Sequence, residues 1–91
     1  MLILVKYGCD NVADCHKFSL ALPGDQIILI QNGVFWAISD DIDPFLKKGI
    51  EIFAIEPDFD ARGFAKEDAK VPLISYNGFI ELLEKTEKTL G

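Results

Sequence analysis

The stretch that decides the fold is DQIILI, residues 25–30, in which four aliphatic residues follow two polar ones. Two similar runs occur at residues 2–7 (LILVKY) and 50–55 (IEIFAI). A strand that is covered on both faces loses the alternation of polar and apolar residues that marks a half-exposed sheet. We therefore predict that these three runs are buried, parallel strands.

A fourth, shorter run is VPLI at residues 71–74. Its Pro72 has no N–H to donate to a neighbouring strand, so this strand belongs at an edge or its nitrogen faces outward. Segments with helical spacing of apolar residues separate the strands. The clearest of them is residues 11–22, which stop at Pro23-Gly24, a normal end for a helix.

The last part of the chain predicts an amphipathic helix that begins after Ser75 and whose apolar face can extend to Leu90. Shorter helical turns are expected at 39–49 and 57–63, each closed by a glycine. Alternating strands and helices imply a parallel sheet with right-handed crossovers. We therefore predict a small α/β protein, a three-layer α/β/α sandwich of flavodoxin-like type with a four-stranded, mainly parallel sheet, in a single domain over residues 1–91.

Charge and composition exclude several functions. Fifteen acidic residues against nine basic ones give a net charge of −6, which repels phosphate, so direct binding to nucleic acid is not expected. No apolar run approaches a membrane span, and the opening LILV is too short for a signal peptide. Two cysteines are too few for a secreted disulfide scaffold. We expect a soluble, cytoplasmic protein, and no phosphate-binding loop motif calls for a bound cofactor.

The two cysteines are candidate reactive groups. Cys9 lies in GCDN, where the positive end of the following helix favours a thiolate and Asp10 opposes it. Cys15 falls on the apolar stripe of that helix together with Val12, Phe18 (or Ser19) and Leu22, and a cysteine in such a stripe usually behaves as a small hydrophobe. His16 follows directly, but adjacent helical residues point about 100° apart, so no Cys-His dyad is evident. For both thiols, a reactive and a structural role remain open. The spacing matches no zinc motif, so no metal site is expected.

Arg62 is a candidate for anion binding or for a structural contact. In the segment PDFDARGF it follows Asp58 by four residues, the spacing at which a carboxylate and an arginine pair on a helix. We favour the ion pair within the chain, with an anion site as the alternative.

The segment QNGVFWAI, residues 31–38, places Val34, Phe35 and Trp36 directly after the polar turn that contains Asn32. Positions after the carboxyl ends of parallel strands are where ligands and partners gather. Trp and Phe are also favoured anchors in subunit contacts. We expect these four residues to form an interface with another subunit. The alternative is that Phe35 and Trp36 are buried in the core of their own chain.

Three segments together resemble one known family, the DsrH/TusB proteins. GDQIILIQNGVFWAI resembles the second strand and turn of that family, and IEIFAIEPDFDARGF resembles its third strand and Ala-Arg-Gly signature. VPLISYNGFIELLEK resembles the closing strand and helix. The resemblance covers the chain after residue 24, with the segments in the same order and spacing.

The resemblance implies a subunit of a sulfur-relay complex with a DsrE-like fold. Such subunits assemble with DsrE/TusD-like and DsrF/TusC-like partners or form homodimers, and they pass persulfide sulfur toward 2-thiolation of the tRNA wobble uridine or toward sulfur oxidation. A B-type subunit of this kind is chiefly structural rather than an enzyme. Cys15 is the nearest match to a first-helix cysteine found in some DsrH proteins, which makes it the first candidate persulfide carrier and Cys9 the second. The alternative function is a homodimeric, flavodoxin-like module that binds a small ligand or a partner without sulfur chemistry.

Overall fold

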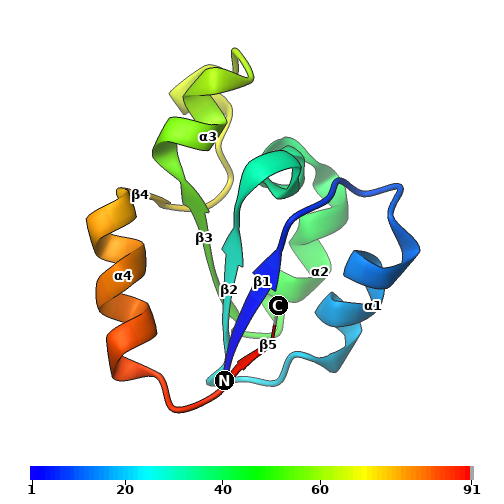
Figure 1. Cartoon of the computed structure of the whole chain (residues 1–91). Helices are drawn as coiled ribbons and strands as arrows, with labels where there is room; N and C mark the ends of the chain where they lie inside the picture. The colour runs from blue at the N-terminus through cyan, green and yellow to red at the C-terminus, as the bar shows by residue number, and fades with distance from the viewer. Residues whose placement is uncertain (91) are drawn as a thin grey trace.

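A sheet of five parallel strands forms the centre of the computed structural model, which describes residues 1–90 (Figure 1). The predicted α/β class and parallel sheet are confirmed. The strands lie in the order β4-β3-β2-β1-β5 and comprise β1 (Leu2–Val5), β2 (Gln26–Leu29), β3 (Glu51–Ile55), β4 (Leu73–Ile74) and β5 (Thr89–Leu90).

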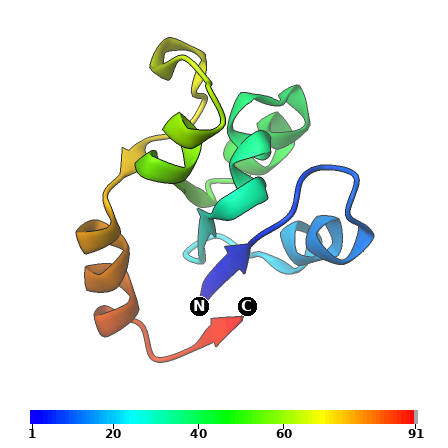
Figure 2. The same ribbon diagram turned by 45° about the horizontal axis from the view of Figure 1, so that its top comes forward.

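The sheet has one strand more than the four that we predicted. The final helix ends at Lys85, and Leu90, which we placed on that helix, lies instead in β5. There it runs parallel to β1 and pairs with Ile3, at the edge of the sheet next to the N-terminus (Figure 2). Two residues are too few to produce a hydrophobic period, so the sequence pattern could not reveal this strand.

Helices cover both faces of the sheet (Figure 1). α1 and α2 lie on one face and α4 on the other, whereas α3 follows β3 at the carboxyl edge. The bounds are α1 (Val12–Leu20), α2 (Asp43–Lys47), α3 (Glu56–Ala61) and α4 (Tyr76–Lys85), with short 3-10 helices η1 (Gln31–Ile38), η2 (Asp40–Ile42) and η3 (Lys66–Asp68). Within residues 1–90 no helix combines the length and the apolar character that crossing a membrane requires.

Alternate residues of β1, β2, β3 and β4 supply two separate hydrophobic clusters. Ile27 and Leu29 of β2 point toward α1 and α2 and join the larger cluster around Phe18. Ile28 points to the opposite face and joins a smaller cluster, against which Phe79 of α4 packs. Both faces of the central strands are therefore buried, as the continuous aliphatic runs predicted.

The expectation that Val34 and Trp36 form an exposed contact surface is wrong for the single chain. Val34 is fully buried and Trp36 is 3% exposed, with its ring centroid 4.3 Å from that of Phe18. The reason is the geometry of η1, because side chains three positions apart eclipse one another along a 3-10 helix. Two of the three rows of side chains face the core, and the remaining row presents Phe35 and Ile38 to solvent.

Candidate functional site

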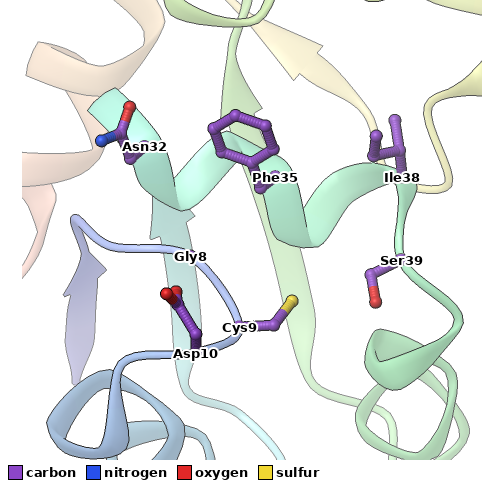
Figure 3. Close-up of a pocket in the computed structure, with 7 residues that line it drawn as sticks. All are labelled: Gly8, Cys9, Asp10, Asn32, Phe35, Ile38 and Ser39. Atoms are coloured by element: carbon purple, nitrogen blue, oxygen red, sulfur yellow. The ribbon is translucent and has the colours of Figure 1, made fainter.

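An open pocket of about 570 Å³ lies at the carboxyl ends of β1 and β2 (Figure 3). Its walls are the loop between β1 and α1 and the outer side of η1. In open parallel sheets this edge is where ligands bind. The lining residues are Gly8, Cys9, Asp10, Asn32, Phe35, Ile38 and Ser39.

Gly33 allows η1 to lie against the end of β1 and so fixes one wall of the pocket. A Cβ atom at this position would lie 2.0 Å from the carbonyl oxygen of Val5, closer than any non-bonded contact. The first turn of η1 begins with a left-handed residue, Gln31, whose φ is +52°. A glycine at position 33 is therefore required by the close approach of two backbones.

Asp58 and Arg62 hold this turn in place. The Asp58 carboxylate accepts hydrogen bonds from the backbone N–H of Gln31 at 2.7 Å and from the Tyr76 hydroxyl at 2.9 Å. Arg62 donates through Nε to the Asn32 side-chain oxygen at 3.0 Å and through Nη1 to the Asp58 backbone oxygen at 3.1 Å. The expected Arg62–Asp58 ion pair is wrong, because the Asp58 carboxylate is turned toward Gln31 and Tyr76. The anion-binding alternative for Arg62 stays a prediction.

Cys9 is the thiol that faces the pocket, with its sulfur directed toward Ser39 (Figure 3). Burial raises the pKa of Cys9 above its ordinary value, and the negative charge of Asp41 and the neighbouring Cys15 raise it further. A hydrogen bond with the Ser39 hydroxyl lowers this pKa without reversing the shift. At neutral pH Cys9 is therefore mainly a protonated thiol.

Cys15 lies on α1, half-buried, and packs against the larger hydrophobic cluster. Its Sγ–H donates a hydrogen bond to the backbone oxygen of Cys9 at 3.1 Å. Other parts of the predicted apolar stripe are wrong, because Val12 and Leu22 are exposed. His16 is also exposed. The structure thus brings the two predicted thiols together at one end of α1.

Asp14 is the residue that the sequence pattern did not reveal, and it is 2% exposed. Its carboxylate accepts hydrogen bonds from the backbone N–H groups of Lys6 at 2.9 Å and Tyr7 at 2.7 Å, and it pairs with the Lys17 ammonium at 3.0 Å. Its own N–H donates to the side chain of Asn11, the N-cap of α1. These contacts tie the Cys9 loop to both β1 and α1. The sequence signal that could have revealed Asp14 is an acidic residue three positions after an asparagine that caps the helix.

Among residues 1–90, no group of three or more His, Cys, Asp or Glu side chains is arranged to hold a metal ion. The chemistry that this edge of the sheet offers is that of two neighbouring thiols beside an open pocket, with an exposed phenylalanine on its rim.

A family model and the sequences of known proteins point to the same group of relatives. Residues 7–89 match the model of the family described as DsrH like protein. Protein TusB of Erwinia tasmaniensis is 32% identical over 93 aligned positions, which cover 99% of this chain and 95% of that protein. Protein TusB of Serratia proteamaculans is 35% identical over 69 positions, which cover 72% of this chain and 73% of that protein.

A solved structure is similar to this chain in both sequence and fold. The solution NMR structure of Protein Tm0979 from Thermotoga maritima is 48% identical in sequence, with a TM-score of 0.75 over 100% of both chains. A second NMR structure of that protein gives a TM-score of 0.72 over 98% of this chain and 97% of that one. With the family model matching nearly its whole length, this chain belongs to the DsrH/TusB family.

Proposed function

We propose that this protein is a structural subunit of a sulfur-relay complex that supports 2-thiolation of the tRNA wobble uridine. Membership of the DsrH/TusB family supports the sulfur-relay role. The proposed partners are TusD-like and TusC-like subunits, with a second copy of this chain as the other possibility. The net charge of −6 suits a subunit that contacts other proteins and leaves RNA to a later enzyme.

The observation that carries the proposal is an exposed surface on the outer side of η1, formed by Asn32, Phe35 and Ile38 and named here the η1 rim. Phe35 is 41% exposed and Ile38 37%, although both are large apolar side chains. Phe35 is also held in place by an edge-on contact with Phe64, whose ring centroid is 5.1 Å away. A fixed aromatic side chain on an exposed rim is a favoured anchor for a protein partner.

Replacing Phe35 with Asp tests the assembly role. The charge opposes burial in an interface, so we expect the variant to fall from the assembled mass to that of a monomer, and to lose its partners in co-purification. Leu22→Asp is the matched control, because Leu22 is 66% exposed and lies before β2, at the opposite edge of the sheet. Light scattering measures the mass, and circular dichroism verifies the fold of both variants. An unchanged mass and unchanged partners for Phe35→Asp refute the η1 rim as the interface.

A carrier role for the thiols is a separate part of the proposal. Cys9 and Cys15 are both free and half-buried. Incubation with a cysteine desulfurase and cysteine, followed by intact-mass measurement, shows whether one sulfur atom is added to the chain. Cys9→Ser and Cys15→Ser identify the thiol that receives it. No added sulfur on either thiol leaves the protein with a purely structural role.

Small-ligand binding is a second candidate function, and the pocket is the observation that favours it. Its volume of about 570 Å³ falls within the usual range of ligand sites. Native mass spectrometry of the freshly purified protein tests this function, because a retained ligand gives a mass above that of the denatured chain. Identical native and denatured masses count against a tightly held ligand.

A further inference from the structure

Cys9 and Cys15 are close enough to be considered as a pair. The hydrogen bond from the Cys15 thiol to the Cys9 backbone oxygen is 3.1 Å long. With ordinary covalent geometry this contact places the two Cα atoms within about 8 Å of each other. Disulfides have Cα separations of about 4.4 to 6.8 Å, so a small movement of the Cys9 loop brings the pair into range.

The two sulfur atoms have different surroundings, which suit the two thiols to different steps of a sulfur-transfer reaction. Cys9 lines the open pocket, so a sulfur donor in solution or on a partner can reach it (Figure 3). Cys15 does not line the pocket, and its thiol donates a hydrogen bond to the Cys9 backbone oxygen. In this structure the Cys9 sulfur is directed toward Ser39. Pairing with Cys15 therefore requires a rotamer change of Cys9. Partly exposed side chains make such changes within nanoseconds.

We propose that Cys9 accepts sulfane sulfur and that Cys15 discharges it by closing an internal disulfide. This inference rests on the carrier part of the proposed function. The Cys15 thiol first gives its proton to water, and the resulting thiolate attacks the inner sulfur of the protonated Cys9 persulfide. The bond between the two Sγ atoms forms, the bond from Cys9 Sγ to the sulfane sulfur breaks, and hydrosulfide leaves. The Cys15 sulfur is oxidised from the thiol to the disulfide level, the sulfane sulfur is reduced to sulfide, and the Cys9 sulfur keeps its oxidation level, so no external oxidant is required.

Leaving-group chemistry favours this outcome over simple transfer of the sulfur to Cys15. Attack on the outer sulfur expels the Cys9 thiolate, whose formation is opposed by burial and by Asp41, both of which raise the pKa of Cys9. Attack on the inner sulfur expels hydrosulfide, which is the anion of a stronger acid than the Cys9 thiol. The thiol of lower pKa leaves faster in this class of reaction. A reducing thiol then returns the pair to its starting state.

The test loads the protein with inorganic polysulfide, which supplies sulfane sulfur to an accessible thiol without a desulfurase. After the donor is removed, dilute samples are followed by intact-mass spectrometry and by a sulfide assay. We expect the wild-type chain to lose the added sulfur, release sulfide and become two hydrogens lighter than the reduced chain. Cys15→Ser, or Cys15→Ala if the serine variant folds poorly, should keep the added sulfur at least about tenfold longer and never become lighter.

Three outcomes overturn the inference. These are equal persistence of the added sulfur in wild type and Cys15→Ser, a disulfide that forms only between chains, and no uptake at Cys9. Because polysulfide loading bypasses the desulfurase, the proposed function is judged separately. If polysulfide loads and discharges the pair as expected but the desulfurase adds no sulfur, the thiol chemistry stands and the carrier role fails. If the desulfurase loads Cys9 and the sulfur then persists in wild type, the carrier role stands and the discharge step fails.

Discussion

Removing the Asp14 carboxylate should destabilise the protein more than removing any exposed carboxylate. Asp14 is 2% exposed and accepts from the backbone N–H groups of Lys6 and Tyr7, so Asp14→Ala leaves two donors without their partner. Each such unsatisfied donor costs about 1 to 3 kcal/mol, and breaking a buried ion pair costs about 3 to 5 kcal/mol in all. Lys17 is partly exposed and can regain water, which favours the lower half of that range. We expect a loss of about 3 to 4 kcal/mol in the free energy of unfolding.

The assay is urea unfolding followed by circular dichroism, with thermal unfolding as a second measure. In a domain of this size a loss of 1 kcal/mol lowers Tm by about 4 to 8 °C, so the predicted drop is about 12 °C or more. Asp14→Asn keeps one acceptor oxygen and most of the shape, and should lose distinctly less stability than Asp14→Ala. Asp40→Ala is the control, since Asp40 is exposed and pairs with Lys70 at the surface.

The reactivity of Cys9 distinguishes a local effect of Asp14 on its loop from a general loss of stability. Asp14 ties the loop of Cys9 to β1 and α1, so Asp14→Asn should increase the rate at which iodoacetamide modifies Cys9 under conditions where the chain remains folded. If Asp14→Ala unfolds at the same urea concentration as Asp40→Ala, and the Cys9 rate is unchanged in Asp14→Asn, the assignment of Asp14 as the anchor of this loop is refuted.

Three further predictions concern η1 and the pocket. Gly33→Ala should cost about 3 kcal/mol or more, because the new Cβ meets the carbonyl oxygen of Val5, and chemical unfolding measures the loss. Trp36→Ala should cost about 3 to 5 kcal/mol, whereas Trp36→Phe, which removes a buried indole N–H that has no partner within residues 1–90, should cost less than about 1.5 kcal/mol. The pH dependence of iodoacetamide modification should give Cys9 a pKa above that of an ordinary thiol. Asp41→Asn should lower this pKa because it removes a negative charge that opposes the thiolate.

The sequence revealed the central strands because their physical signal is strong. DQIILI and its two counterparts are covered on both faces, and such burial imposes an aliphatic side chain at nearly every position. The edge strand β5 carries no such signal, because Thr89 and Leu90 are only two residues and Thr89 is exposed. β5 forms because it pairs with β1, and a pattern within residues 89–90 carries no information about that distant strand.

The candidate site was harder to predict because its important contacts are between segments. Both cysteines were found as candidate thiols, but their mutual contact depends on the path of the loop between β1 and α1. The apolar stripe assumed for α1 included Val12 and excluded Asp14, whereas the structure exposes the valine and buries the aspartate. A buried carboxylate is stable there only because two backbone N–H groups and an ammonium converge on it, and that convergence is tertiary.

In the segment QNGVFWAI the two adjacent aromatic residues have different roles because of the helix type that they belong to. Along an α-helix neighbouring residues point about 100° apart, whereas along a 3-10 helix they point about 120° apart and each third residue returns to the same row. In η1 this rotation puts the Trp36 ring against Phe18 in the core and leaves Phe35 on the rim of the pocket. The core contact and the proposed interface are therefore built on one rigid turn of backbone. Loss of Phe35 should remove the partner and leave the fold, whereas loss of Trp36 should weaken the fold and affect the partner only through displacement of η1.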